Sequence, residues 1–411
     1  MTEGEKVFGL PAEQGRWLFV VLGLVTTVCL GAVYAYSLFL GPVRKAFPDI
    51  TAFQANLPYM VFLALFSVTM FFGGRVMEKM GPRKLMMIGG IIVALGWMLS
   101  SIAPNIWVLT LTYGVIAGGG VGLVYGCPVA TAAKWFPDRK GLAVGLVLAG
   151  FGGSALITGK IANVLLPSVG LSSTFLYFGL AFSVLLVLLS LPYRFPAAGW
   201  SPKGWKPAAG TVAAEDFTPA EMVKTSTFWS LSLCFLIGSI SGLMAIGISK
   251  PVGNEIISIS GVMAGTLVGI FAIFNAVGRP LFGWLCDTIT PRYAAMLNMA
   301  LILVVSILMI GAKSGDTVLY TLCFMGFWLS LGGWLAIAPT STVTFFGLKN
   351  YTRNYGVVFF AYGLGAILGG IISGQAKDVF GTYTFAFYPT AVLAVVGLVM
   401  AYALLKPPKK A

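Results

Sequence analysis

The 411-residue sequence contains no histidine and only 13 aspartates and glutamates. Without histidine a His-based proton relay is excluded and a metalloenzyme is disfavoured, so we expect neither a metal site nor another cofactor. The five cysteines lie in apolar stretches without a CxxC pair, which predicts free buried thiols. Charged residues make up 9% of the chain and hydrophobic residues 58%, whereas soluble domains carry about 25% charged residues. This composition predicts a protein that crosses the lipid bilayer many times.

The 26 lysines and arginines give a formal charge of +13, which taken alone would suggest nucleic-acid binding. Their distribution argues otherwise, because about 19 of the 26 fall in the termini and in loops that we assign to one side. By the positive-inside rule, that side is cytoplasmic. We therefore expect a monomeric, multi-pass protein of the plasma (inner) membrane, with both termini in the cytoplasm and no nucleic-acid partner.

Twelve apolar segments are long enough to cross a bilayer as helices. We expect spans at 17–41, 54–75, 84–103, 106–132, 141–166 and 172–193, and again at 226–250, 261–286, 293–312, 316–344, 354–376 and 382–405. This predicts an all-α membrane protein of two six-helix bundles, 1–193 and 226–411, joined by a cytoplasmic linker, 194–225. Near the end of the linker, Thr218, Pro219 and Glu221 predict a short capped helix.

A short pattern at the cytoplasmic side occurs once in each half. It consists of a glycine, an acid four residues later and a following arginine, found as Gly74, Glu78 and Arg83 and again as Gly283, Asp287 and Arg292. The glycines and the acids are each separated by 209 residues, which predicts parallel repeats around a central pathway. The glycine would allow close helix packing, and the acid and arginine would latch the cytoplasmic side. The alternative is an ordinary basic inner loop.

The apolar stretch from Gly261 to Leu285 carries one full charge, Arg279. An arginine near the middle of a membrane helix costs roughly 2.5–3.5 kcal/mol on insertion scales, so it needs a partner or water. Asn275 lies one turn earlier on the same face. The pair predicts a water-filled cavity in which the guanidinium binds a carboxylate with two hydrogen bonds. Alternatively, Arg279 lies near the cytoplasmic end, marked by Asp287, and snorkels to lipid headgroups.

Four stretches carry a resemblance to a known family: AGGGVGLVYG (117–126), KWFPDRKGLAVG (134–145), NAVGRPLFG (275–283) and RNYGVVFFAYGLGAILGG (353–370). Over essentially its whole length, the chain resembles major facilitator superfamily transporters. It is most similar among them to the oxalate:formate antiporter family and the proton-coupled monocarboxylate transporters. The resemblance implies a secondary transporter and not an enzyme, in which Arg279 binds the substrate carboxylate. It also implies that the cavity is lined by Tyr34, Gln54 and Tyr125, and by Phe359 beside Tyr362.

Two positions depart from the relatives. In the mammalian transporters an acid precedes the arginine that corresponds to Arg279 by four residues, and this position is Asn275 here. In the antiporters a lysine occupies the position that corresponds to Tyr362 here. A dianion in a low-dielectric cavity needs two positive groups, whereas a monoanion needs one. With Arg279 as the expected cavity cation, a single carboxylate such as lactate, pyruvate or acetate is favoured.

Proton coupling requires a titratable group that senses the substrate or the gate. Glu255, near the outer mouth, is the best candidate, with Lys250 or Lys377 as its partner when the outer gate closes; the alternative is a solvated loop acid. Three functions remain open at this point. They are proton-coupled monocarboxylate symport, carboxylate antiport such as oxalate:formate exchange, and a membrane sensor that transports nothing.

Overall fold

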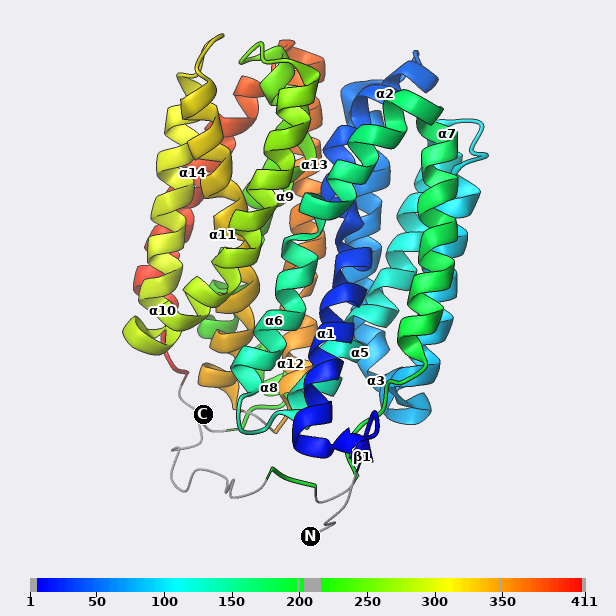
Figure 1. Cartoon of the computed structure of the whole chain (residues 1–411). Coiled ribbons are helices and arrows are strands. Elements are labelled where there is room, and N and C mark those ends of the chain that lie inside the picture. Colours follow the sequence, from blue (N-terminus) through cyan, green and yellow to red (C-terminus); the bar gives the residue numbers. More distant parts are fainter. Residues whose placement is uncertain (1–5, 198–199, 203–215, 348, 409–411) are drawn as a thin grey trace.

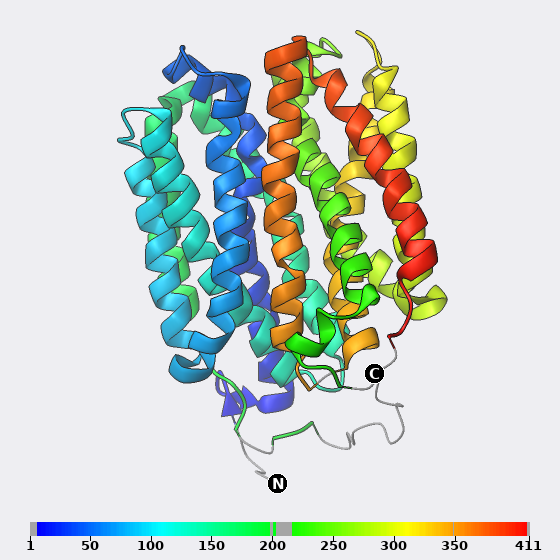
Figure 2. The ribbon, with the colours of Figure 1, turned by 180° about the vertical axis from the view of Figure 1, so that it is seen from behind.

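The computed structural model describes residues 6–197, 200–202, 216–347 and 349–408 (Figure 1). Long helices run side by side in two bundles, one formed by the first half of the chain and one by the second (Figures 1 and 2). Both termini lie at the same end of the molecule, which we call the inner end, and the opposite end is the outer end. The linker predicted at 194–225 lies partly outside the described residues, so its limits stay a prediction.

The first half contains a small hairpin followed by four of the nine long helical segments found among the described residues. The hairpin pairs β1 (Lys6–Val7) with β2 (Leu10–Pro11). The helices are α1 (Ala12–Leu30), continued by the 3₁₀ helix η1 (Gly31–Leu38), α2 (Leu40–Ala46), α3 (Ala52–Ser100), α4 (Ile106–Leu109), continued by the π-helix η2 (Thr110–Ala117) and α5 (Gly118–Trp135), α6 (Lys140–Gly152) and α7 (Ser154–Ser190).

Every secondary-structure element in the described part of the second half is a helix. Its elements are α8 (Pro219–Met222), α9 (Ser226–Glu255), α10 (Gly261–Ile310), α11 (Thr317–Phe346), α12 (Tyr351–Val358), α13 (Phe360–Phe380), η3 (Tyr383–Ala386) and α14 (Phe387–Leu404). The predicted short helix is confirmed, because Thr218 and Glu221 form a reciprocal capping box at the start of α8. The five cysteines are buried free thiols, as expected.

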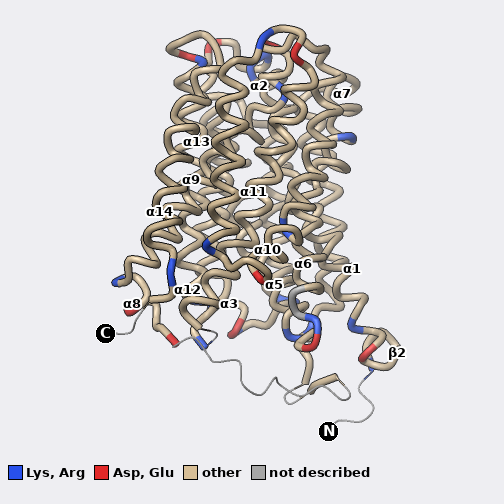
Figure 3. Tube along the Cα trace, turned by 90° about the vertical axis from the view of Figure 1, so that its left-hand side faces the viewer, with Lys and Arg blue, Asp and Glu red and all other residues tan. Residues whose placement is uncertain are grey.

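Twelve membrane spans fit this architecture. Nine helical segments within the described residues are long and apolar enough to cross a bilayer, and three of them are 49 or 50 residues long. Each long segment contains two of the predicted spans and folds back at a single residue with a positive φ: Gly81, Gly170 and Thr290. Lysine, arginine, aspartate and glutamate residues lie mainly toward the two ends of the molecule, and few lie in the middle (Figure 3).

The connections expected between the spans 54–75 and 84–103, and between 261–286 and 293–312, are not loops, because helical hydrogen bonding continues up to one reversing residue. That residue is Gly81 in the first half (φ 77°, ψ 165°) and Thr290 in the second (φ 79°, ψ 153°). Proline follows each of them and suits the first turn of the next helix, where no backbone donor is needed. The two reversals are 209 residues apart in the sequence, so the repeat extends to the backbone conformation.

The described residues ahead of the first expected span, 17–41, are folded onto the first bundle. Val7 is 1% exposed and belongs to a cluster with Phe19, Trp135 and Phe136, and α1 already begins at Ala12. An apolar residue next to an amphipathic helix start buries more surface by folding back onto α1 than by remaining in solvent. The hairpin therefore covers the inner end of the first bundle.

Candidate functional site

The Arg279 side chain is a buried cation without a counter-charge. It lies on α10, is 3% exposed, and its Nη2 donates a long hydrogen bond of 3.4 Å to Asn275 Oδ1. Its Nε and Nη1 have no hydrogen-bond partner among the described residues. Among the described residues, the ion pairs within 4.0 Å are Arg16–Asp138 and Lys377–Glu255, so no carboxylate neutralises Arg279. Such a guanidinium is prepared to accept an anion.

Asn275 is held in place by the neighbouring helix α11. Its Nδ2 donates to the carbonyl of Trp328 at 3.0 Å. The two helices touch so closely that a Cβ added at Gly332 would lie 2.1 Å from the Asn275 carbonyl oxygen. The amide oxygen of Asn275 is thereby directed at Arg279, which fixes the orientation of the guanidinium.

The first bundle meets this pair through a glycine. A Cβ added at Gly152, the last residue of α6, would lie 2.7 Å from Asn275 Oδ1 and 3.0 Å from Arg279 Nε. The helical path breaks between α6 and α7 at Gly153. Arg279 therefore faces the interface between the bundles rather than the lipid, and the snorkelling alternative loses its geometric basis.

Four of the predicted aromatic residues form one cluster at this interface. The Tyr34 and Tyr362 hydroxyls are 2.9 Å apart and join η1 of the first bundle to α13 of the second. The Tyr34 and Tyr125 hydroxyls lie close enough to Arg279 to interact electrostatically with its positive charge. Phe359 stacks on Tyr362 with ring centroids 4.9 Å apart. The structure thus brings residues from helices far apart in sequence to one buried place.

Two further aromatic residues of this site were missed by sequence reasoning. The Phe66 ring on α3 contacts Tyr125, Phe359 and Tyr362, and the Phe151 ring lies 5.9 Å from the Arg279 guanidinium carbon. With 30 phenylalanines in the chain, nothing in the sequence singles out these two. They form apolar walls against which a methyl or methylene group would pack.

Gln54 lies elsewhere, at the outer start of α3. It completes a capping box in which the Thr51 backbone donates to Gln54 Oε1 at 2.9 Å, and the Gln54 backbone donates to Thr51 Oγ1 at 3.1 Å. Its side chain is occupied by stabilising the helix start, and a role in substrate binding stays a prediction.

Glu255 is paired with a lysine at the outer end. Its Oε2 lies 2.6 Å from Lys377 Nζ, which also donates to the Gly381 carbonyl at 2.9 Å. The pair connects the last residue of α9 with α13, both in the second bundle. Of the two lysines expected as partners, Lys377 is the one in contact in this conformation.

The residues of the predicted cytoplasmic latch are not joined to one another in this conformation. Glu78, Arg83 and Asp287 are exposed, and neither acid forms an ion pair with another described residue. Arg292 instead donates to the Tyr402 carbonyl and lies 4.9 Å from the centre of the Tyr402 ring. Their gating role stays a prediction for a conformation in which the inner side is shut.

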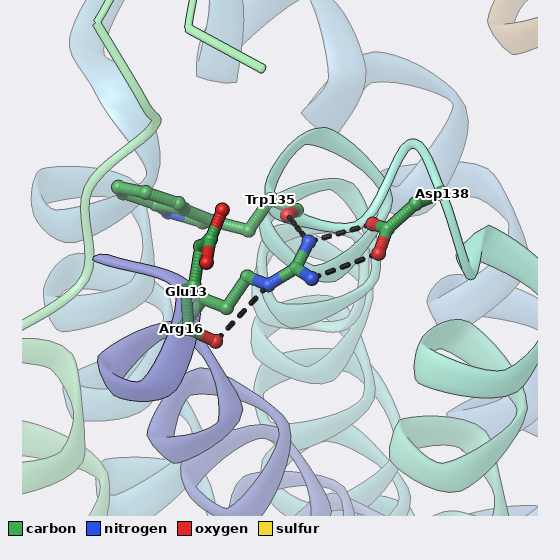
Figure 4. Close-up of polar contacts among 4 residues, drawn as sticks. All are labelled: Glu13, Arg16, Trp135 and Asp138. Carbon is green, nitrogen blue, oxygen red and sulfur yellow. Dashed lines mark hydrogen bonds and ion pairs between the residues drawn. The ribbon is translucent and has the colours of Figure 1, made fainter. Parts of the chain in front are cut away.

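A strong ion pair at the inner end was missed by sequence reasoning (Figure 4). Arg16 binds both carboxylate oxygens of Asp138, Nη1 to Oδ1 at 2.6 Å and Nη2 to Oδ2 at 2.8 Å, and also donates to the Trp135 carbonyl at 3.0 Å. The guanidinium covers the Phe136 ring at 4.4 Å. Hydrogen bonding by Arg16 lowers the pKa of the Asp138 carboxyl. The pair fixes the start of α1 to the loop that follows α5.

Asp378, on α13, joins the two bundles at the outer end. The Asp378 carboxylate accepts hydrogen bonds from the backbone of Ala52 at 2.7 Å and of Phe53 at 2.9 Å. These are the first two residues of α3, where a negative charge also interacts favourably with the helix dipole.

The sequence profile of the Major Facilitator Superfamily matches residues 22–345 and, in an overlapping second match, residues 244–411. The chain belongs to this superfamily of transporters. The oxalate:formate antiporter of Oxalobacter formigenes is 30% identical over 393 residues, which are 94% of this chain and 90% of that protein. Monocarboxylate transporter 9 of Rattus norvegicus is 25% identical over 470 aligned residues, covering 93% and 91% of the two chains.

A solved structure of the same superfamily fold agrees with this assignment. The crystal structure of a bacterial homologue of the human lysosomal transporter Spinster matches with a TM-score of 0.70 and 17% identity, covering 95% of this chain and 96% of that one. The expected superfamily fold and the relation to oxalate:formate and monocarboxylate transporters are therefore confirmed.

Proposed function

We propose that this superfamily transporter carries a small monocarboxylate and a proton together across the plasma membrane by alternating access. The observation that carries the proposal is the Arg279 guanidinium, which is 3% exposed and has two nitrogens without a hydrogen-bond partner. Removing a charge from water without a counter-charge costs several kcal/mol. A bound carboxylate would offset that cost, so the anion would stabilise the closed interface that transport requires.

The surroundings of Arg279 support a single carboxylate as the substrate. The hydroxyls of Tyr34, Tyr125 and Tyr362 stand where a second cation would be needed to hold a dianion in a low-dielectric site. Asn275 orients the guanidinium, and Phe359 adds an apolar wall for a short carbon chain. Lactate, pyruvate and acetate have this combination of one negative charge and one small apolar group.

Glu255 is the group to which we assign the proton. Its pairing with Lys377 at 2.6 Å links α9 to α13, and α13 carries Tyr362 of the central site. Protonation of Glu255 would remove the charge that attracts Lys377 and free α13 to move relative to α9. A proton would then be required for part of the cycle, which is the basis of symport.

Carboxylate exchange is the second candidate, because the relative named oxalate:formate antiporter is 30% identical over almost the whole chain. Exchange predicts uptake that requires an internal counter-substrate and does not respond to an imposed pH gradient. A membrane sensor would accumulate no acid at all. These outcomes separate the three functions in one experiment.

The experiment is uptake of labelled lactate, acetate, formate and oxalate into proteoliposomes, with and without a pH gradient. The unmodified protein should accumulate a monocarboxylate only when the gradient drives protons inward. Arg279→Ala should reduce uptake at least about a hundredfold, since a lost charged contact of ~2.7 kcal/mol corresponds to that factor. The matched control is Lys160→Ala, which removes an exposed cation from another membrane helix. Equal uptake by the two variants would contradict the role of Arg279.

Glu255→Gln tests the proton assignment separately. It should abolish the response to the pH gradient and preserve exchange of labelled for unlabelled substrate, because the anion site remains intact. An unchanged response to the gradient would place the proton on another group.

A further inference from the structure

Two cavities open between the bundles at the outer end, and Lys250 lines both of them. The smaller has a volume of about 90 Å³ and is lined by residues of both bundles, among them Ser37, Arg44, Lys250, Glu255 and Tyr383. The larger, of about 920 Å³, is lined by parts of η1, α2, α7, α9 and α10. Lys250 therefore stands where the large outer cavity meets the small one.

The small cavity has an excess of positive charge. Its one lining acid, Glu255, is already neutralised by Lys377 at 2.6 Å. Neither Arg44 nor Lys250 forms an ion pair with another described residue. Two cations that line one partly open cavity attract anions and raise their local concentration.

A buried hydroxyl in the cavity also lacks a partner. Ser37 is 1% exposed, lines the small cavity, and its Oγ makes no hydrogen bond. Buried hydroxyl groups are nearly always bonded, so an orphaned one indicates a missing partner. The hydroxyl can donate to a carboxylate oxygen, while Leu40 and Pro251 provide apolar wall for a carbon chain. A volume of about 90 Å³ holds several water molecules, which suits an acid of two or three carbons.

We propose that this cavity is a second anion site, which captures a small monocarboxylate on Lys250, Arg44 and Ser37 before it reaches Arg279. The route inward follows η1, because Ser37 lies one 3₁₀ turn from Tyr34, whose hydroxyl bonds Tyr362 across the bundles. The identity of the anion as the transported substrate rests on the proposed function. The existence of the site does not, since a cationic cavity binds a carboxylate whether or not transport follows.

Binding at this site is measured with the central site removed. Saturation-transfer NMR with sodium lactate on Arg279→Gln protein in lipid nanodiscs should still give a signal from bound lactate. The signal should disappear when Lys250→Gln is added and persist when Lys313→Gln is added instead. Lys313 is an exposed cation in the outer turn between α10 and α11 and lines neither cavity, so it controls for the loss of one outer charge.

Absence of a signal from the Arg279→Gln protein, or equal signals from the two double variants, would overturn the proposal. If Lys250→Gln does not fold, Ser37→Ala in the same background decides, since it removes the hydroxyl without adding volume and should weaken the signal. In proteoliposomes, Lys250→Gln alone should lower kcat/KM for lactate uptake on the order of fivefold through lost electrostatic attraction, with Lys313→Gln unchanged. Failure of the unmodified protein to take up any acid would instead contradict the proposed function and leave the binding result standing.

Discussion

At the scale of single residues, the central site depends on how closely Gly152 approaches Arg279 and Asn275. A side chain at this position would occupy the space beside the guanidinium, since even its Cβ would lie 3.0 Å from Arg279 Nε and 2.7 Å from Asn275 Oδ1. Glycine therefore lets the backbone of the first bundle approach the guanidinium closely, while its Nε and Nη1 remain buried without a partner among the described residues.

Gly152→Ala is expected to raise the KM for monocarboxylate uptake about tenfold, equivalent to ~1.4 kcal/mol, because the added methyl group displaces the guanidinium. The matched control is Gly145→Ala on the same helix, where an added Cβ meets nothing within 4 Å. The measurement is initial uptake rate against substrate concentration in proteoliposomes. Equal KM values for the two variants would show that the space beside Arg279 is not used by the substrate.

The Arg16–Asp138 pair gives a residue-scale prediction about pH. Arg16 lowers the pKa of Asp138 in the folded protein below its unfolded value of about 3.9. The unfolded state then binds more protons as the pH falls, so the stabilisation is fully present above the unfolded pKa and is lost as the pH falls through the folded one. Asp138→Asn should therefore lower stability at pH 7 by about 1–3 kcal/mol and make no difference at pH values below the folded pKa.

Thermal unfolding of the detergent-solubilised protein, followed by tryptophan fluorescence from pH 7 downward, measures this effect. Asp49→Asn is the control, because Asp49 is exposed and lies outside the Arg16 pair. A difference between Asp138→Asn and the unmodified protein that stayed constant down to the lowest pH would mean that charge is not the source of the stabilisation.

Sequence reasoning found Arg279 and Asn275 because a charge within an apolar run is conspicuous and its helical neighbour follows from periodicity. It missed the Arg16–Asp138 pair, whose members are 122 residues apart, because spacing along the chain carries no information about such a contact. It missed Gly152 for a related reason. Gly152 is one of 52 glycines, and its closeness to Arg279 can be recognised only once the helix of the other bundle is placed against it.

At the scale of elements, the helices were predictable and their connections were not. The twelve spans could be located from the lengths of the apolar segments. Backbone groups without hydrogen bonds are costly in lipid, so such segments cross the bilayer as helices. The connections at Gly81 and Thr290 are shorter than any loop that polar composition suggests, because one residue with a positive φ followed by proline reverses the chain. Polar residues such as Glu78 and Arg83 remain in helix beside the reversal.

The two reversals differ in one respect that can be tested. Thr290 adopts a φ of 79°, which costs a β-branched residue about 1–3 kcal/mol, whereas glycine adopts it without steric cost. Glycine loses more backbone entropy on folding, which offsets part of the gain, so Thr290→Gly should stabilise the protein by about 1 kcal/mol. Gly81→Thr should destabilise it by a similar or larger amount, although an added Cβ at Gly81 meets nothing within 4 Å.

Thermal unfolding of both variants and of the unmodified protein checks the pair. The opposite signs expected at equivalent positions of the repeat serve as an internal control, since both substitutions exchange the same two residues. A destabilising Thr290→Gly would mean that the threonine side chain contributes more than the backbone conformation costs.

At the scale of the whole molecule, the bundles touch along the full depth of their interface. At the outer end Asp378 bonds the start of α3, and near it a Cβ added at Gly374 would lie 2.6 Å from the Phe53 Cα. Further inward, Ser67 donates to the Phe359 carbonyl at 2.9 Å. Under the proposed alternating access, a substrate at Arg279 leaves toward the outer end only after the contacts at that end break.

Asp378 provides a charged contact between the bundles at the outer end, and its loss should favour opening there. In Asp378→Asn the amide can accept through one oxygen only and the interaction with the α3 dipole is lost, together about 1–2 kcal/mol. The population with an open outer side should then rise about five- to thirtyfold. Spin labels at Ile102 and Val318, which are 76% and 74% exposed at the outer ends of the two bundles, report this opening as a longer distance in pulsed electron paramagnetic resonance.

Asp316→Asn is the matched control for this experiment. Asp316 also accepts a backbone hydrogen bond at the outer end, from Lys313 at 2.8 Å, but that bond stays within one bundle. Its loss should leave the distance distribution unchanged, because no contact between the bundles is weakened. If Asp378→Asn and Asp316→Asn gave the same distribution, the outer side would be held shut by apolar packing, such as that between Gly374 and Phe53, and not by the charge on Asp378. The Asp378 carboxylate would then be only a cap for α3, and the opening of the transporter would depend on contacts that no single charge controls.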